Sequence, residues 1–299
     1  MEGITTLEFV DIYKYSMDIS KSGKYMVRAS NSKIWLTDFT NKKVINKVNA
    51  TCHSVVDISD DDKFCLFTSE GEARIVVFSL PELVKVASLD VHYASSLKFI
   101  SLEEILIYQI EKGGAENYSL TKWNFVTNER ETLLFEKNSD YPCHVAFSTN
   151  ESLCMVCPSY KHRRTKLYVF ENENLSQFEV EWDDGVLYCG AFSQVLNSHI
   201  LINRRLKNFD DIGIYNFEDK TYLPLLNYRA MNLYWITDRL IWCSDIYSSS
   251  LLNLKGEVLF EWDSGIRLAQ CSNEDYVIFS NSCGSYLFKK IKTDNAELQ

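Results

Sequence analysis

The stretch "MDISKSGKYMV", residues 17–27, returns as "VDISDDDKFCLF" at residues 56–67. Each copy contains an alternating apolar run, a polar turn opened by Ser, and a second apolar run. Apolar and polar residues that alternate on both sides of a turn predict two antiparallel strands. Later copies begin at residues 145, 190 and 269, and looser copies begin at residues 97 and 233.

A third-strand signal follows every copy, an apolar residue and then a polar one just before a turn. These signals begin at Thr37, Phe78, Trp123, Phe170, Tyr215, Leu252 and Phe288, with spacings of 41, 45, 47, 45, 37 and 36 residues. A period near 40 residues is typical of a four-stranded propeller blade. We therefore predict an all-β chain folded as a seven-bladed β-propeller.

The repeat also predicts the domain organisation, a single propeller domain over residues 1–299. The blades are expected at about 14–49, 50–90, 91–137, 138–182, 183–227, 228–262 and 263–292. The last blade has only three strands of its own, and an extra strand, "ITTLEFVDI", spans Ile4 to Ile12 before the first blade. We expect this N-terminal strand to complete the last blade, because closure removes exposed sheet edges.

The motifs "SKSGKYMV", "SDDDKFCLF" and "KWNFVTNE" resemble the WD-repeat-like seven-bladed propellers, in degenerate form and along nearly the whole chain. Trp123-Asn124 is the best match to the Trp-Asp pair that gives the family its name. The family's Gly-His dipeptide before the inner strand is absent. The resemblance implies a rigid platform for protein contacts.

Two other Trp-Asp pairs, in "EWDDG" and "EWDSG", stand 80 positions apart at Trp182 and Trp262. They follow the third-strand signal by 10 to 12 residues, so we expect them at the ends of outer strands, two blades apart. Each Trp is expected either to pack between adjacent blades or to anchor a partner at the rim of an interface.

Composition narrows the class of protein. The chain is 46% apolar and 13% aromatic, which is enough for a sizeable core. It has no apolar run long enough to span a membrane and no signal peptide at its start, so a cytoplasmic protein is expected. Nine cysteines without an export signal predict reduced core thiols, and the formal charge of -10 argues against general nucleic-acid binding.

Catalytic and metal-binding motifs are not evident. Cys154 and Cys157 have a CxxC spacing, but they fall within a predicted strand, where residues three apart point to opposite faces. The five histidines do not cluster, and no phosphate-binding or nucleophile motif occurs. We predict no enzyme activity and no cofactor. The alternative is a lactonase-like or hydrolase-like enzyme with a site in the central channel, near Asp18, Asp57 and His144.

Charge patterning suggests where a partner binds. In a propeller, the loops between second and third strands share one end with the connections between blades, and the expected blades four and five both place basic loops there. With the two aromatic residues, the candidate partner-binding residues are Lys161, His162, Arg163, Arg164, Lys166, Arg204, Arg205, Lys207, Trp182 and Trp262. Arg side chains suit a partner with an acidic segment. Alternatively, these are solvated loops neutralised by Asp183, Asp184, Asp210 and Asp211.

The opposite end of the blades is expected to be acidic, with Asp60, Asp61, Asp62, Glu103, Glu104, Glu151, Glu274 and Asp275. Taken together, these observations predict a non-enzymatic protein-protein interaction module. It would act as a scaffold subunit or as an inhibitor or immunity-type protein that docks a protein partner on one face.

Overall fold

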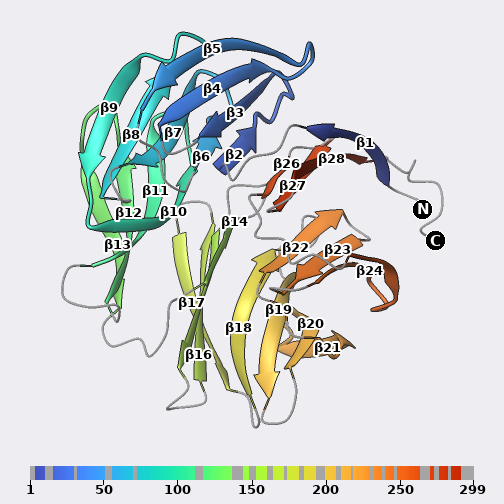
Figure 1. The fold of residues 1–299 in the computed structure, drawn as a ribbon. Helices are drawn as coiled ribbons and strands as arrows, with labels where there is room; N and C mark the ends of the chain where they lie inside the picture. Colours follow the sequence, from blue (N-terminus) through green and yellow to red (C-terminus); the bar gives the residue numbers. More distant parts are fainter. Residues whose placement is uncertain are drawn as a thin grey trace. The chain divides into compact units, whose positions relative to one another are not determined.

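A computed structural model describes most of the chain as β-strands (Figure 1). The described residues are 4–10, 16–29, 32–50, 56–69, 73–111, 117–136, 144–147, 153–159, 164–171, 174–181, 185–192, 199–206, 210–216, 218–228, 230, 232–237, 240–245, 248–262, 270–272, 276–281 and 284–290. These residues include no helix that is long and apolar enough to cross a membrane.

The strands form seven four-stranded antiparallel sheets, and their contacts group into two compact units. The first unit covers residues 1–71, 75–88 and 267–299, and the second covers 72–74 and 89–266. Three sheets lie in the first unit, apart from the strand ends at Arg74, Leu89 and Asp90. Four sheets lie in the second. Apart from the N-terminal strand, the strands of each sheet lie within one interval of the sequence repeat.

The three sheets of the first unit are built from strands near both ends of the chain. They are β2 (Ser16–Ile19), β3 (Tyr25–Ala29), β4 (Lys33–Asp38) and β5 (Lys43–Asn49); β6 (Val56–Ile58), β7 (Phe64–Ser69), β8 (Arg74–Ser79) and β9 (Lys85–Asp90); and β26 (Gln270–Ser272), β27 (Tyr276–Asn281) and β28 (Gly284–Lys290) with β1 (Ile4–Val10).

The four sheets of the second unit follow one another along the chain. They are β10 (Tyr93–Phe99), β11 (Glu104–Ile110), β12 (Tyr118–Asn124) and β13 (Arg130–Glu136); β14 (His144–Phe147), β15 (Leu153–Ser159), β16 (Arg164–Glu171) and β17 (Asn174–Glu181); β18 (Gly185–Phe192), β19 (His199–Leu206), β20 (Asp210–Asn216) and β21 (Thr221–Leu226); and β22 (Asn232–Thr237), β23 (Leu240–Ser244), β24 (Ser249–Asn253) and β25 (Val258–Trp262).

The N-terminal strand completes the last sheet, as predicted. β1 pairs antiparallel with β28, from Ile4 opposite Lys290 to Val10 opposite Ser285 (Figure 1). The strand order of that sheet is β1-β28-β27-β26, so residues from both ends of the chain share one sheet. This pairing satisfies backbone groups that would otherwise form an exposed edge at β28.

The serine of the repeat holds the turn between the first and second strands. The Ser20 hydroxyl accepts a hydrogen bond from the Tyr25 backbone N–H at 2.9 Å. The Ser59 hydroxyl accepts the equivalent bond from Phe64, also at 2.9 Å. Short polar side chains that bond to nearby backbone groups favour turns over continued strand. The repeated Ser is therefore a turn-forming residue.

The polar residue of the third-strand signal has a similar role at the next turn. Asp38 accepts a bond from the Asn41 N–H at 2.9 Å, and Asn216 accepts one from the Glu218 N–H at 2.9 Å. Asn253 does the same for Lys255, at 2.9 Å. These are Asx turns, in which the side chain replaces a backbone acceptor. The polar residue of the third-strand signal thus ends the strand and starts the turn.

Burial follows the order of strands within each sheet. The second strands β7 and β23 are buried almost throughout, whereas every residue of the fourth strand β5 is exposed or half-buried. The core clusters each span consecutive sheets. One packs Val27 and Leu36 against Phe67 and Val76, and another packs Leu201 and Ile212 against Trp235. Faces of neighbouring sheets therefore cover one another, which removes their apolar surface from water.

Cys243 in β23 is a fully buried free thiol, in agreement with the expected core role. Burial raises its pKa from an ordinary value of 9.0 to about 12. The folded state thus favours the neutral thiol, and this contribution to stability is complete below pH 9 and is lost as the pH rises toward 12.

We expect the free energy of unfolding to fall with pH in this range, with Cys243 adding up to about 1.4 kcal/mol per pH unit. Urea unfolding of wild type and Cys243→Ala across this range measures that contribution. The variant is less stable overall but has a shallower pH dependence. Equal slopes for the two proteins would show that the Cys243 thiol does not contribute.

Candidate functional site

The sheet β10–β13 presents two turns at the same end. One turn, at residues 100–103, joins β10 to β11, and the other, at residues 125–129, joins β12 to β13. The backbone N–H of Phe125 donates a hydrogen bond to the carbonyl of Glu103 at 3.0 Å, which ties the turns together. The Phe125 ring packs edge-on against Phe99 and Trp123, with ring centroids 6.1 and 6.3 Å apart. The turns thus rest on a buried aromatic base.

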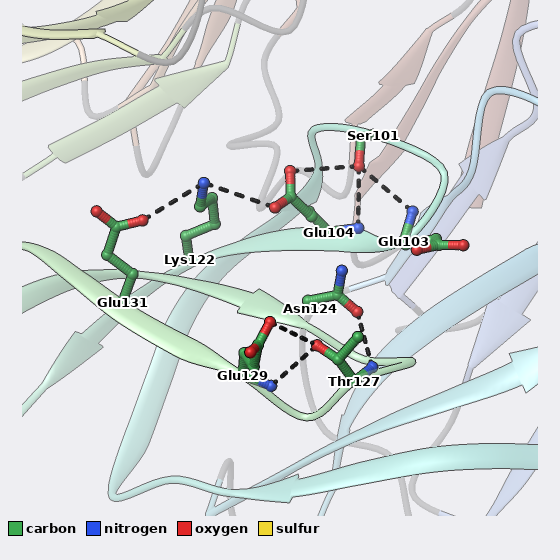
Figure 2. A network of polar contacts seen from close by, with 8 residues as sticks. All are labelled: Ser101, Glu103, Glu104, Lys122, Asn124, Thr127, Glu129 and Glu131. Atoms are coloured by element: carbon green, nitrogen blue, oxygen red, sulfur yellow. Dashed lines mark hydrogen bonds and ion pairs between the residues drawn. The ribbon is translucent and has the colours of Figure 1, made fainter.

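Side chains within the turns hold their backbones in place (Figure 2). The Ser101 hydroxyl accepts bonds from the backbone N–H groups of Glu103 and Glu104, at 3.3 and 3.1 Å. The Asn124 carbonyl oxygen accepts bonds from the N–H groups of Val126 and Thr127, at 3.0 and 2.9 Å. Ser and Asn favour turns because their side chains can bond to backbone one to three residues on. The two turns are therefore built locally by their own sequence.

Glutamates outnumber cations around these turns. Figure 2 shows Lys122 between Glu104 and Glu131, with its Nζ 3.5 Å from one carboxylate and 3.4 Å from the other. Partial burial lowers the pKa of Lys122, but the charge of Glu104 and the charge and hydrogen bond of Glu131 outweigh it and raise the pKa. Glu103 and Glu129 are exposed on the turns themselves. Four glutamates thus belong to this end of the sheet, and two of them pair with Lys122.

Two apolar side chains project at the tips of the turns. Leu102 is 51% exposed and Val126 is 62% exposed. We name these residues, with Glu103, Thr127 and Glu129, the turn surface. An apolar centre with a charged rim is the usual anatomy of a protein-protein interface. Glu103 and Glu104 were expected at an acidic end, but Leu102 and Val126 were not predicted as site residues. The signal that could have revealed them is an apolar residue inside a polar turn.

The acidic turn of the first unit, at residues 60–62, differs from the turn surface because lysines neutralise its charge. The Nζ atom of Lys21 lies 2.6 Å from a carboxylate oxygen of Asp60, and the Nζ atom of Lys63 lies 3.0 Å from one of Asp61. Asp62 accepts a hydrogen bond from the Ser22 hydroxyl. Of the residues expected at the acidic end, Glu151, Glu274 and Asp275 lie outside the described residues. Within the described part of the chain, the turn surface therefore has the larger excess of carboxylates.

The predicted basic patch is described only in part. Lys161, His162, Arg163, Trp182 and Lys207 lie outside the described residues. For four more residues only the backbone is described, with Arg164 and Lys166 in β16, Arg205 in β19 and Trp262 at the end of β25. Their role in partner binding stays a prediction. The outer strands β17 and β25 end at Glu181 and Trp262, as expected for the two Trp-Asp pairs.

Arg204 is the one member of the patch whose side-chain contacts are described, and it pairs within the chain. Its guanidinium donates to both carboxylate oxygens of Asp211, at 3.0 and 2.6 Å, and lies 4.4 Å from the centre of the Tyr222 ring. The Tyr222 hydroxyl also donates to Asp211, at 3.1 Å. The hydrogen bond to Asp211 raises the pKa of Arg204. This is the neutralisation by Asp211 that the alternative interpretation expected.

The residues considered for a channel site have structural contacts where they are described. Asp18 accepts a hydrogen bond from the Ile58 backbone N–H at 3.0 Å and so joins β2 to β6. Asp57 is only 3% exposed. His144 begins β14, and its side chain is not described. Within the described residues no three His, Cys, Asp or Glu side chains form a group suited to a metal ion.

A polar cavity of about 380 Å³ lies beside the sheet β10–β13. Its two carboxylates already have partners in the chain. Asp90 pairs with Arg74 at 2.7 Å, and Glu111 accepts bonds from the Gln109 amide and the Ser119 hydroxyl. These internal contacts make the cavity a weaker candidate than the turn surface, where Glu103 and Glu129 are exposed.

No protein-family profile and no curated protein sequence matches the chain. Solved structures do resemble it. Hydrazine synthase from Kuenenia stuttgartiensis aligns with a TM-score of 0.67 and 11% identity, covering 93% of this chain and 95% of the other. The Swd1 β-propeller domain of Myceliophteria thermophila aligns with a TM-score of 0.65 and 8% identity, over 97% and 100% of the two chains. This chain has a β-propeller fold.

A third propeller-like match is the N-terminal domain of Nup159, with a TM-score of 0.63, 13% identity and coverage of 96% of this chain and 95% of that one. Identities this low establish the propeller fold alone. The function of this propeller must therefore be argued from its own surface.

Proposed function

We propose that this propeller is a non-enzymatic interaction module that docks a protein partner on the turn surface. The observation that carries the proposal is the pair of exposed apolar side chains, Leu102 and Val126, on turns fixed by a backbone hydrogen bond and rimmed by carboxylates. A rigid surface loses little conformational entropy on binding, which favours affinity. We further propose that the seven sheets close into one WD-repeat-like ring.

The charge of the turn surface specifies the partner's chemistry. Glu103 and Glu129 would pair with Lys or Arg, while Leu102 and Val126 would contact an apolar side chain. The partner segment is thus basic and apolar. An acidic partner on the basic patch remains the second docking hypothesis, with one change: Arg204 belongs to the structural ion pair with Asp211 and not to the docking set.

Affinity capture from lysate of the native cells, followed by quantitative mass spectrometry, tests the proposal. We expect Leu102→Asp with Val126→Asp to reduce recovery of the partner by about tenfold or more, because hot-spot residues contribute a large share of binding energy. The matched control is Val84→Asp, which alters a side chain that is 57% exposed in the other unit.

A third bait carries Arg163→Glu, Arg164→Glu and Arg205→Glu and leaves the Arg204–Asp211 pair intact. Loss of the partner with this bait, but not with the turn-surface variant, would transfer the site to the basic patch. Capture unaffected by either variant would overturn both docking hypotheses.

The alternative of a lactonase-like or hydrolase-like enzyme has a separate test. Such an enzyme needs several polar side chains directed into the channel, commonly around a metal ion. Elemental analysis of the purified protein would favour the enzyme if it detected a stoichiometric metal that chelation removes together with hydrolase activity. Without both results, the interaction module remains the proposal.

A further inference from the structure

The outer strand β25 has an unusually apolar exposed edge. It is the last strand of its sheet, with β24 as its neighbour. Val258, Leu259 and Phe260 are consecutive, and they are 49%, 46% and 40% exposed. Edge strands in soluble proteins commonly carry Pro, which blocks pairing with another chain, or charged residues, which repel an edge of like charge. The equivalent strand β21 contains Pro224, whereas β25 has no Pro.

The outer strand β5 is also exposed and apolar at its centre, but its flanks carry the opposite charge. Val44 and Ile45 are each 43% exposed, between the exposed Lys43 and Lys47. In β25 the apolar residues lie between the exposed Glu257 and Glu261. Both pairs of charges are four residues apart. Opposite charges that face each other across strands stabilise a sheet, and like charges destabilise it.

We propose that β5 of one copy of this protein pairs antiparallel with β25 of a second copy. A single register aligns the charged and the apolar residues of the two strands. It places Lys43 opposite Glu261, Val44 opposite Phe260, Ile45 opposite Leu259, Asn46 opposite Val258 and Lys47 opposite Glu257. Both ion pairs and the apolar contacts between them then form together.

The bulges of the two strands fit this register. In β5, Val44 and Asn46 pair with adjacent residues of β4, so Ile45 is the extra residue. In β25, Val258 and Phe260 pair with adjacent residues of β24, so Leu259 is the extra residue. A bulge increases the local twist of its strand. The proposed register places the two bulges opposite each other, so the residues on both sides of the bulges remain paired.

The proposed contact joins two different surfaces, so each copy has one edge of each kind. Repeated contacts of this kind build open chains of copies or closed rings, of which two copies joined by both contacts form the smallest. Because the flanking charges are exposed, the assembly should weaken at about 1 M NaCl, where the Debye length is about 3 Å.

Sedimentation velocity over a range of protein concentrations tests the proposal. In low salt, the average mass of the wild type should rise with concentration. We expect Lys43→Glu with Lys47→Glu, and separately Glu257→Lys with Glu261→Lys, to raise the concentration needed for assembly by about tenfold or more. Lys85→Glu, an exposed charge on the outer strand β9, is the matched control and should assemble as the wild type does.

Mixing provides the decisive comparison. The Lys43→Glu/Lys47→Glu protein has an acidic β5 edge, and the Glu257→Lys/Glu261→Lys protein has a basic β25 edge. Each fails to pair with itself, but a mixture of the two should assemble, and so should one chain with all four substitutions. Far-UV circular dichroism checks that every variant is folded.

A wild type that stays monomeric at every concentration would overturn the proposal. Assembly that both charge-reversed variants retain would also overturn it, because another surface would then be responsible. Loss of assembly that neither mixing nor the fourfold substitution restores would contradict the proposed register.

Discussion

Replacement of Arg204 by Leu will destabilise the second unit by about 3 kcal/mol, because it leaves a buried carboxylate without its counter-ion. The Asp211 side chain is 3% exposed, and its two oxygens accept both guanidinium bonds at 3.0 and 2.6 Å. Removal of the cation also uncovers one face of the Tyr222 ring. Urea unfolding, followed by circular dichroism, measures this loss of stability as a lower urea concentration at the midpoint of unfolding.

Two further variants separate the buried charge from other effects. Arg204→Leu with Asp211→Asn removes both charges and keeps an acceptor for the Tyr222 hydroxyl, so it should recover more than half of the loss. Arg74→Ala removes a surface ion pair whose Asp90 partner is 79% exposed, and it should cost less than about 1 kcal/mol. Equal losses for Arg204→Leu and Arg74→Ala would contradict the role given to Arg204.

Gly256→Ala will also cost about 3 kcal/mol, for a steric reason. Gly256 has a φ of 78°, where residues with a side chain are strained by about 1 kcal/mol. A Cβ at this position would overlap the carbonyl oxygen of Leu225 and lie 2.8 Å from its carbonyl carbon. These atoms belong to the backbone of β21 and cannot rotate away. Relief of the overlap requires the turn between β24 and β25 to move, which adds about 1 to 3 kcal/mol.

The control for this substitution is Gly23→Ala. Gly23 lies in the turn between β2 and β3 and has a similar φ of 73°. Its replacement should cost about 1 kcal/mol, the strain of a left-handed backbone alone. Thermal unfolding of the two variants compares the losses. Similar losses would show that the backbone of β21 yields easily and that close packing at Gly256 contributes little.

The fold was predictable because the repeat contains turn-forming residues as well as apolar runs. Ser20 and Ser59 hold equivalent turns, and Asn124 ends the third strand of its sheet where the sequence placed the match to Trp-Asp. Such residues act over two to five positions, so sequence order alone reveals them. The division into two units depends on contacts between distant strands, which no local pattern encodes.

The candidate site was harder to predict, because side-chain pairing depends on strand register. "NRRLKNFDD" appeared to be a basic loop, yet the β19–β20 pairing places Arg204 opposite Asp211 and Arg205 opposite Asp210. A register count across the hairpin would have suggested this pairing. The turn surface was missed for another reason. Leu102 and Val126 are 24 residues apart in sequence, and the pairing of Glu104 with Asn124 and the bond between Phe125 and Glu103 bring their turns together.

Hydrogen-deuterium exchange of the propeller, alone and with its captured partner, tests the docking proposal most directly. We expect slower exchange on binding in the two turns at residues 100–104 and 125–129. Protection confined to the segments around Arg163 and Arg205, with those turns unchanged, would contradict it and would place the partner on the basic patch.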